Sequence, residues 1–125
     1  MDYSDIIQDH FENPRNVGII EGAEAEALVS NPACGDMMHL YLRIEQERIT
    51  DAKCKIMGCP AAIAAGSVTT ELLIVRAVEE ALELSRAEVN TALGGLSPQK
   101  VHTSVLAEDA VRAALKKYRS RQSSS

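Results

Sequence analysis

Four side chains of types that bind metal ions stand at separate places in the chain: Cys34, Asp36, Cys59 and His102. Together they form a complete four-coordinate donor set for zinc or iron, which bind thiolate sulfur, imidazole nitrogen and carboxylate oxygen in proteins. No CxxC knuckle is present, so spacing along the sequence does not by itself bring these residues together. Taken singly, each cysteine is equally consistent with a small buried side chain, and His102 with a surface or capping group.

Each candidate ligand is expected in a loop beside the end of a helix or strand. Cys34 is followed by Gly35, which permits a tight turn that leaves the thiol accessible. Asp36 comes two residues after Cys34, so both side chains can reach one ion from an extended loop. Cys59 stands directly before a helix N-terminus, where the helix dipole stabilises a thiolate. With His102 placed just before the last helix, the four side chains can converge at one end of a sheet.

The other cysteine and the other histidines are interpreted as structural. Cys54 shares a strand face with apolar neighbours, which favours a packed side chain rather than a ligand. His39 lies on the polar face of its strand, and His10 lies in the opening helix. Packing or hydrogen bonding is the expected role of both histidines.

Hydrophobic periodicity predicts the sheet. The even-numbered residues from 38 to 44 are apolar and alternate with polar or amphipathic ones, which indicates a strand with one buried face. A hairpin connection at 45–48 leads to a second strand at 49–57. An acidic stretch at 21–26 is a turn or the lead-in to a further strand.

The pattern then changes to helices, predicted over residues 5–12, 60–78, 79–84, from Ser85 to the Gly94–Gly95 pair, and 103–121. Pro60 is favourable at the first helical position, and Ser85 with Glu88 forms a capping box. Strands that precede helices indicate the α+β class. We expect a small antiparallel sheet of about three strands, packed on one face by helices, with a helix at each end of the chain.

Length and charge narrow the function further. A chain of 125 residues suits one domain, which we place at 1–121, followed by a disordered tail at 122–125. The net charge of −5, from 13 basic and 18 acidic residues, argues against nucleic acid as the main partner. No apolar run reaches the roughly 20 residues of a membrane span, and no signal-peptide pattern opens the chain. We therefore expect a cytoplasmic protein without membrane association.

Basic residues gather near the C-terminus: Arg112, Lys116, Lys117, Arg119 and Arg121. Cations are favourable at the C-terminus of a helix, so a solvated helix end explains them. A docking face for an acidic partner is the alternative interpretation.

Four motifs carry a family resemblance over nearly the whole chain. They are the segment from Asp9 to Gly18, Pro32-Ala33-Cys34-Gly35-Asp36, Asp51-Ala52-Lys53 with Gly58-Cys59, and His102 with Leu106-Ala107-Glu108-Asp109-Ala110. In these motifs the chain resembles the iron–sulfur cluster assembly scaffolds of the IscU/NifU N-terminal type. The resemblance implies a non-enzymatic α+β scaffold that accepts iron, receives sulfur as persulfide from a pyridoxal-phosphate cysteine desulfurase, and passes a [2Fe-2S] cluster to apo-proteins.

The resemblance assigns Cys34, Asp36, Cys59 and His102 as metal or cluster ligands and places Lys100 near the cluster. In that family the residue after the histidine is a third cysteine, whereas this chain has Thr103. An alcohol is a poor iron ligand and cannot hold a sulfane sulfur, so sulfur would enter through Cys34 or Cys59, or as free sulfide. Cys34 is the candidate persulfide acceptor. Thr103 is instead expected to cap the last helix.

Three functions remain open at this point. The first is a scaffold with altered ligation, and the second is a mononuclear zinc- or iron-binding regulatory or interaction module. The third is a metal-free interaction protein of the same fold. A homodimer is also open, because two thiolates per chain supply four between two chains. The stretch Leu96-Ser97-Pro98-Gln99-Lys100 differs from the Leu-Pro-Pro-Val-Lys of scaffolds served by a dedicated Hsp70-type chaperone, which argues against that partner.

Overall fold

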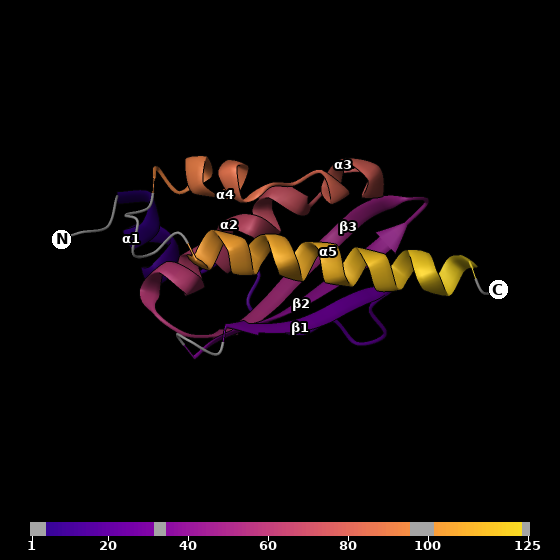
Figure 1. Ribbon diagram of the computed structural model, residues 1–125, viewed down its shortest axis with the longest axis horizontal. Helices are drawn as coiled ribbons and strands as arrows, with labels where there is room; N and C mark the ends of the chain where they lie inside the picture. Colours follow the sequence, from indigo (N-terminus) through magenta and orange to yellow (C-terminus); the bar gives the residue numbers. More distant parts are fainter. Residues whose placement is uncertain (1–4, 32–34, 96–101, 124–125) are drawn as a thin grey trace.

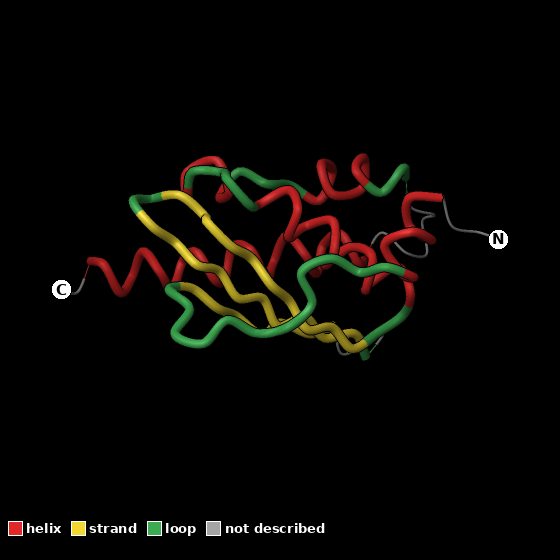
Figure 2. Tube along the Cα trace, turned by 180° about the vertical axis from the view of Figure 1, so that it is seen from behind, coloured by secondary structure: helices red, strands yellow, loops and turns green. Residues whose placement is uncertain are grey.

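The computed structural model of the chain describes residues 5–31, 35–95 and 102–123, with the side chains of residues 102, 122 and 123 left out of the description. The elements are α1 (Asp5–Glu12), β1 (Ala25–Asn31), β2 (Asp36–Glu45), β3 (Arg48–Met57), α2 (Pro60–Leu73), α3 (Val78–Leu82), α4 (Arg86–Ala92) and α5 (His102–Ser123). The three strands form one antiparallel sheet in the order β1-β2-β3. Helices cover one face of this sheet, and the view from behind shows the strands in front of them (Figures 1 and 2). The predicted α+β class, with a helix near each end of the chain, is confirmed.

The alternation of β2 sets the buried face of the sheet. Met38, Leu40 and Leu42 are fully buried and point toward the helices. The ladder between β2 and β3 shifts after Arg43, so that Arg43 pairs with Asp51 while Ile44 pairs with Ile49. The extra residue on β3, Thr50, forms a bulge. Because of this bulge, Ile49 and Ala52 are both buried on the same face of the sheet although they are three positions apart.

The last helix is longer than the sequence pattern indicated. α5 begins at His102 and ends at Ser123, whereas the predicted helix ran from Thr103 to Arg121. Thr103 therefore lies in the first turn, where it is fully buried, and the expectation that it is the N-cap is wrong. The division into a domain at 1–121 and a tail at 122–125 stays a prediction, because residues 124 and 125 lie outside the described part.

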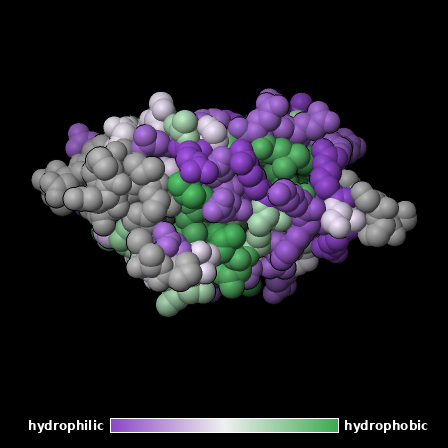
Figure 3. Space-filling model, viewed as in Figure 1, coloured by the Kyte–Doolittle hydropathy of each residue, from purple (hydrophilic) through white to green (hydrophobic). Residues whose placement is uncertain are grey.

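α5 is anchored by a buried carboxylate. Glu108 is 4% exposed and accepts hydrogen bonds from Arg86 at 2.7 Å and from Arg112 at 2.9 Å. On the helix side of the molecule, hydrophilic residues dominate the right half of the view, and hydrophobic residues reach the surface near its middle (Figure 3). None of the described helices combines the length and the apolar character that crossing a membrane requires.

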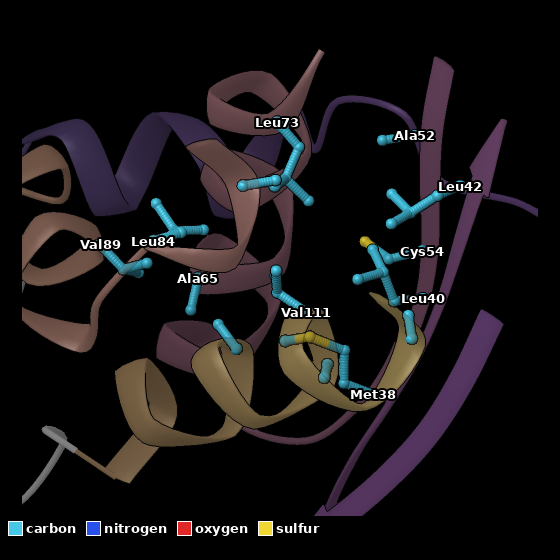
Figure 4. Packing of buried hydrophobic residues seen from close by; sticks show 14 of the residues in the cluster. Met38, Leu40, Leu42, Ala52, Cys54, Ala65, Leu73, Leu84, Val89 and Val111 are labelled. Carbon is cyan, nitrogen blue, oxygen red and sulfur yellow. The ribbon is translucent and has the colours of Figure 1, made fainter. Parts of the chain in front are cut away.

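The core is built from small and aliphatic side chains, as expected for a chain with 3% aromatic residues. Strand residues such as Leu40 and Cys54 meet α2 and α5 residues such as Ala65 and Val111 (Figure 4). α2 lies very close to β3 at Gly66. A Cβ added there would stand 1.9 Å from Cδ1 of Ile56 and 3.2 Å from Sγ of Cys54. The glycine therefore sets how near the helix approaches the sheet.

The outer edge of β3 is closed by two segments. Near the C-terminal end of β3, Asn16 and Gly18 hydrogen-bond to the backbone of Cys54. Farther along, Ile49 exchanges backbone hydrogen bonds with Val75 and Arg76. The second contact explains why α2 ends at Leu73 rather than at the predicted residue 78, because residues 74–77 leave the helix to pair with β3.

α1 packs on α2 through a buried polar cluster. His10 is 6% exposed, and its Nδ1 lies 2.7 Å from Oγ of Ser67. The same Oγ accepts the backbone N–H of Arg15 at 2.8 Å, and Nε2 of His10 lies 3.4 Å from Glu71. Burial lowers the pKa of His10 below its ordinary value of 6.5, with Arg15 adding to the shift, so the neutral ring is favoured.

Gly66→Ala tests the close approach of α2 to the sheet. The steric cost against Ile56 exceeds the helix-propensity gain of roughly 1 kcal/mol, so we expect a net loss of about 1–2 kcal/mol in the free energy of unfolding. Adding Ile56→Val removes the clashing methyl group and should recover most of that loss. Urea denaturation of the two single variants and the double variant measures the coupling. A Gly66→Ala variant as stable as the parent would contradict the packing described.

The His10 cluster makes stability depend on pH. Because the folded pKa is depressed, the unfolded chain takes up a proton that the folded chain resists, so the free energy of unfolding falls as the pH drops below about 6.5. The contribution is fully present above that pH. His10→Gln should reduce the difference in stability between pH 7.5 and pH 5.5. Equal pH dependence in His10→Gln and the parent would refute this.

Candidate metal site at the start of α2

Two of the four candidate ligands meet where β2 and α2 begin. Asp36 is the first residue of β2, is paired with Asn31 of β1, and is 2% exposed. Cys59 follows β3 and is the N-cap residue of α2, with extended backbone angles. Pro60 then occupies the first turn, as expected. The hairpin of β2 and β3 therefore returns the chain to the end of the sheet where Asp36 lies.

The Asp36 carboxylate contacts both the backbone and the side chain of Cys59. The backbone N–H of Cys59 donates to Oδ1 at 3.3 Å, and the thiol donates a weak hydrogen bond to Oδ2 at 3.9 Å. A tetrahedral zinc ion bound to one sulfur and one oxygen would hold these atoms about 3.5–3.7 Å apart. The two donor atoms are thus already close to the separation that a shared ion requires.

The N-terminus of α2 supplies favourable electrostatics for this pair. The backbone carbonyl of Cys59 accepts hydrogen bonds from Ala62 at 3.0 Å and Ile63 at 3.1 Å, so the first turn is well formed. The Cys59 side chain makes no capping hydrogen bond and is left for other contacts. The Asp36 carboxylate and the Cys59 sulfur thus lie at the positive end of the helix dipole.

Gly58 makes room for the carboxylate. A Cβ at this position would stand 2.4 Å from Oδ1 and 2.9 Å from Cγ of Asp36. No side chain other than hydrogen fits without moving the carboxylate. From the sequence, Gly58 was expected only as part of a motif, and this steric role was not predicted. The available signal was a glycine at a strand end directly before a candidate ligand, which often marks a close approach.

The structure places the remaining site residues only in part. His102 is the first residue of α5, and α5 begins at the same end of the molecule as α2 and β2 (Figures 1 and 2). The His102 side chain, Cys34 and Lys100 lie outside the described residues. Within the described ranges, no group of three or more His, Cys, Asp or Glu side chains is arranged to hold a metal ion. The full ligand set stays a prediction.

The structural interpretations of Cys54, His10 and His39 are confirmed. Cys54 is 1% exposed, and burial raises the pKa of its thiol to about 12, so it cannot supply a thiolate near neutral pH. His39 lies 2.9 Å from Glu26 and 3.0 Å from the hydroxyl of Tyr41, on whose ring it stacks. With His10 engaged by Ser67, neither described imidazole is left to serve this site.

Comparisons with a family model and with individual proteins point to the same family. The family model described as the NifU-like N terminal domain matches residues 2–125. The chain is 50% identical over 116 residues to "Iron-sulfur cluster assembly scaffold protein IscU 1" of Archaeoglobus fulgidus, covering 93% of this chain and 76% of that protein. It is 45% identical over 123 residues to "Iron-sulfur cluster assembly scaffold protein IscU" of Azotobacter vinelandii, covering 95% of each.

The fold is also found among solved structures. A NifU-like N-terminal protein from Brucella abortus superposes with a TM-score of 0.81 at 18% identity, covering 96% of both chains. At this identity the likeness shows the fold alone.

Gly58→Ala should weaken metal binding through Asp36. The added methyl group displaces the carboxylate, and loss of such support typically costs ten- to a hundred-fold in affinity, so we expect Zn²⁺ to bind at least about tenfold more weakly. Competition with a chromophoric chelator measures the affinity. In the background of Asp36→Ala, the Gly58→Ala change should have little further effect. Unchanged affinity in the Gly58→Ala single variant would show that the carboxylate does not take part.

Proposed function

The chain belongs to the NifU-like N-terminal domain family, and from this premise we propose that it is an iron–sulfur cluster assembly scaffold. In this proposal it carries a [2Fe-2S] cluster as cargo and delivers it to apo-proteins, so it acts as a carrier rather than as an enzyme. Relatives at 45–50% identity bear the name of such a scaffold. The observation that carries the proposal is the contact of the Asp36 carboxylate with Cys59 at the start of α2.

The proposed ligands are Cys34, Asp36, Cys59 and His102, two for each iron. Histidine ligation of a [2Fe-2S] cluster has precedent and raises its reduction potential. A carboxylate is a harder donor than a thiolate and binds iron less firmly. This mixed set therefore suits a cluster that must leave its protein.

Thr103 stands where the resemblance places a third cysteine. It is fully buried in the first turn of α5, and its hydroxyl cannot carry sulfane sulfur. Sulfur would then enter as a persulfide on Cys34 or Cys59, or as free sulfide. A sulfane sulfur gains two electrons on becoming a bridging sulfide, so the persulfide route requires an external thiol reductant. Cys34 is our candidate acceptor.

The partners follow from this chemistry. A cysteine desulfurase supplies sulfur, and recipient apo-proteins accept the cluster. A dedicated Hsp70-type chaperone is not among the proposed partners, because only part of its recognition sequence is present between Leu96 and Lys100. The free thiols of Cys54 and Cys59 in the described part of the chain, and a labile cluster, fit a reducing compartment, which supports a cytoplasmic location. A homodimer that shares one cluster is a further arrangement of the same ligands.

The alternative function is a mononuclear zinc- or iron-binding regulatory or interaction module. It is favoured by one observation, namely that a single carboxylate and a single thiol meet with the separation one tetrahedral ion needs. The same four residues would complete its shell, and metal binding would then contribute to the stability of the fold.

Anaerobic reconstitution tests the proposal. The purified protein receives ferrous iron, a thiol reductant, and either sulfide or cysteine with a desulfurase. Visible spectra and analysis of iron, zinc and sulfide are then recorded for the parent, His102→Ala and Thr103→Cys. We expect a [2Fe-2S] spectrum in the parent, its loss in His102→Ala, and transfer of the cluster to an apo-ferredoxin.

A colourless parent protein that retains one zinc ion, and turns brown only in Thr103→Cys, would refute the scaffold and establish the alternative module. If the His102→Ala variant assembles the cluster as well as the parent does, the proposed ligand set is wrong, but the scaffold function still holds.

A further inference from the structure

The two edges of the sheet differ in whether other segments hydrogen-bond to them. The outer edge of β3 is closed by residues 16–18 and by residues 74–77, which hydrogen-bond to its backbone. β1 forms the opposite edge, and among the described residues only β2 pairs with it. β1 lies along the border of the sheet beside α5 (Figure 1). The outward backbone groups of residues 25–30 are therefore available to a further strand.

β1 carries little of the usual protection of an edge strand, and its one charged side chain, Glu26, is paired with His39. Natural proteins block such edges with lysine, proline, bulges or very short strands. The sequence of β1, Ala-Glu-Ala-Leu-Val-Ser-Asn, has seven residues without lysine, arginine or proline, and its register with β2 is regular. Leu28 is moreover 55% exposed on the open face of the sheet. These features suit a strand that accepts a partner rather than one that repels it.

A groove of about 320 Å³ runs along this edge. It is lined by residues 24–28 of the β1 segment, by His39 of β2, and by Lys117 and Arg121 of α5. The two cations are one helical turn apart and therefore lie on the same side of α5. The surface around the C-terminal half of α5, on the right of the view, is largely hydrophilic (Figure 3).

The charges in the groove favour an acidic occupant. The Glu24 carboxylate is engaged by Arg43 at 3.3 Å and by the backbone N–H of Ile44 at 2.9 Å. The Glu26 carboxylate lies 2.9 Å from His39. Lys117, by contrast, makes no ion pair within the described part of the chain. The groove's own carboxylates are thus satisfied, and its lysine is left for an outside group.

We propose that the open edge of β1 binds an extended acidic segment of a partner protein, which adds to the sheet as a fourth strand. Main-chain hydrogen bonds to β1 would provide affinity, and carboxylates at alternate positions would contact Lys117 and Arg121. This explains the basic C-terminal half of α5 better than a solvated helix end does. The inference goes beyond the scaffold function and does not depend on it, because the groove lies toward the start of β1 whereas Asp36 pairs with its last residue.

The probe is a blocked peptide of sequence EVETEVE, titrated into the ¹⁵N-labelled protein at low salt. We expect saturable shifts of the backbone amide signals of residues 25–30. Lys117→Glu should weaken binding about tenfold, because it replaces an attraction by a repulsion. The matched control is Lys116→Glu, an exposed neighbour that does not line the groove, which should change binding less than about twofold. The dispersion of the amide spectrum verifies that both variants are folded.

Strand addition is separated from simple charge attraction by a second peptide with the same side chains and alternate backbone nitrogens methylated. Loss of binding by this peptide is expected, because it cannot donate to the edge of β1. Equal binding of both peptides, equal weakening by Lys116→Glu and Lys117→Glu, or the absence of saturable shifts would each overturn the proposal. Sedimentation showing that copies of the chain pair through β1 and exclude the peptide would overturn it as well.

Discussion

The hydrogen bond from the Cys59 backbone N–H to the buried Asp36 carboxylate ties the start of α2 to the start of β2. A carboxylate that is 2% exposed requires partners that offset its loss of hydration, and the N-terminus of a helix provides them. The contact exists only because Gly58 presents no side chain to the carboxylate. Once it is made, the Cys59 sulfur is held beside the Asp36 oxygens, which is the arrangement from which metal chemistry can begin.

The rest of the fold serves to hold these two element starts in place. Gly66 lets α2 lie against β3, and the Cys54 thiol is thereby sealed into the core. Two cysteines five positions apart thus differ in exposure and in reactivity. Cys59, at the end of the sheet, keeps partial exposure and a polar neighbour, whereas Cys54 is removed from thiolate chemistry by burial. The fold selects which sulfur can take part in chemistry.

Much of this arrangement could be predicted from local sequence signals. The alternation from Met38 to Ile44 fixes the buried face of β2, and Pro60 marks the start of α2. The end of α2 at Leu73 could not be predicted this way, because residues 74–77 leave the helix to satisfy the distant edge of β3. The start of α5 was predicted one residue too late. Thr103 therefore lies in the buried first turn of the helix rather than at its N-cap.

The candidate site, too, could be predicted from the sequence only in part. Residue types indicated Asp36 and Cys59 as ligands, but their contact depends on strand register and on the space left by Gly58, which periodicity does not encode. The open edge of β1 is likewise a property of the assembled sheet, although its lack of protecting residues is visible in the sequence.

In the proposed site, Asp36 and Cys59 bind one metal centre together with Cys34 and His102. X-ray absorption spectroscopy of the zinc-loaded protein tests it most directly. Two sulfur and two nitrogen or oxygen neighbours at zinc, with one light neighbour lost in Asp36→Ala, is the predicted result. A shell unchanged by Asp36→Ala, or one without sulfur, would contradict it.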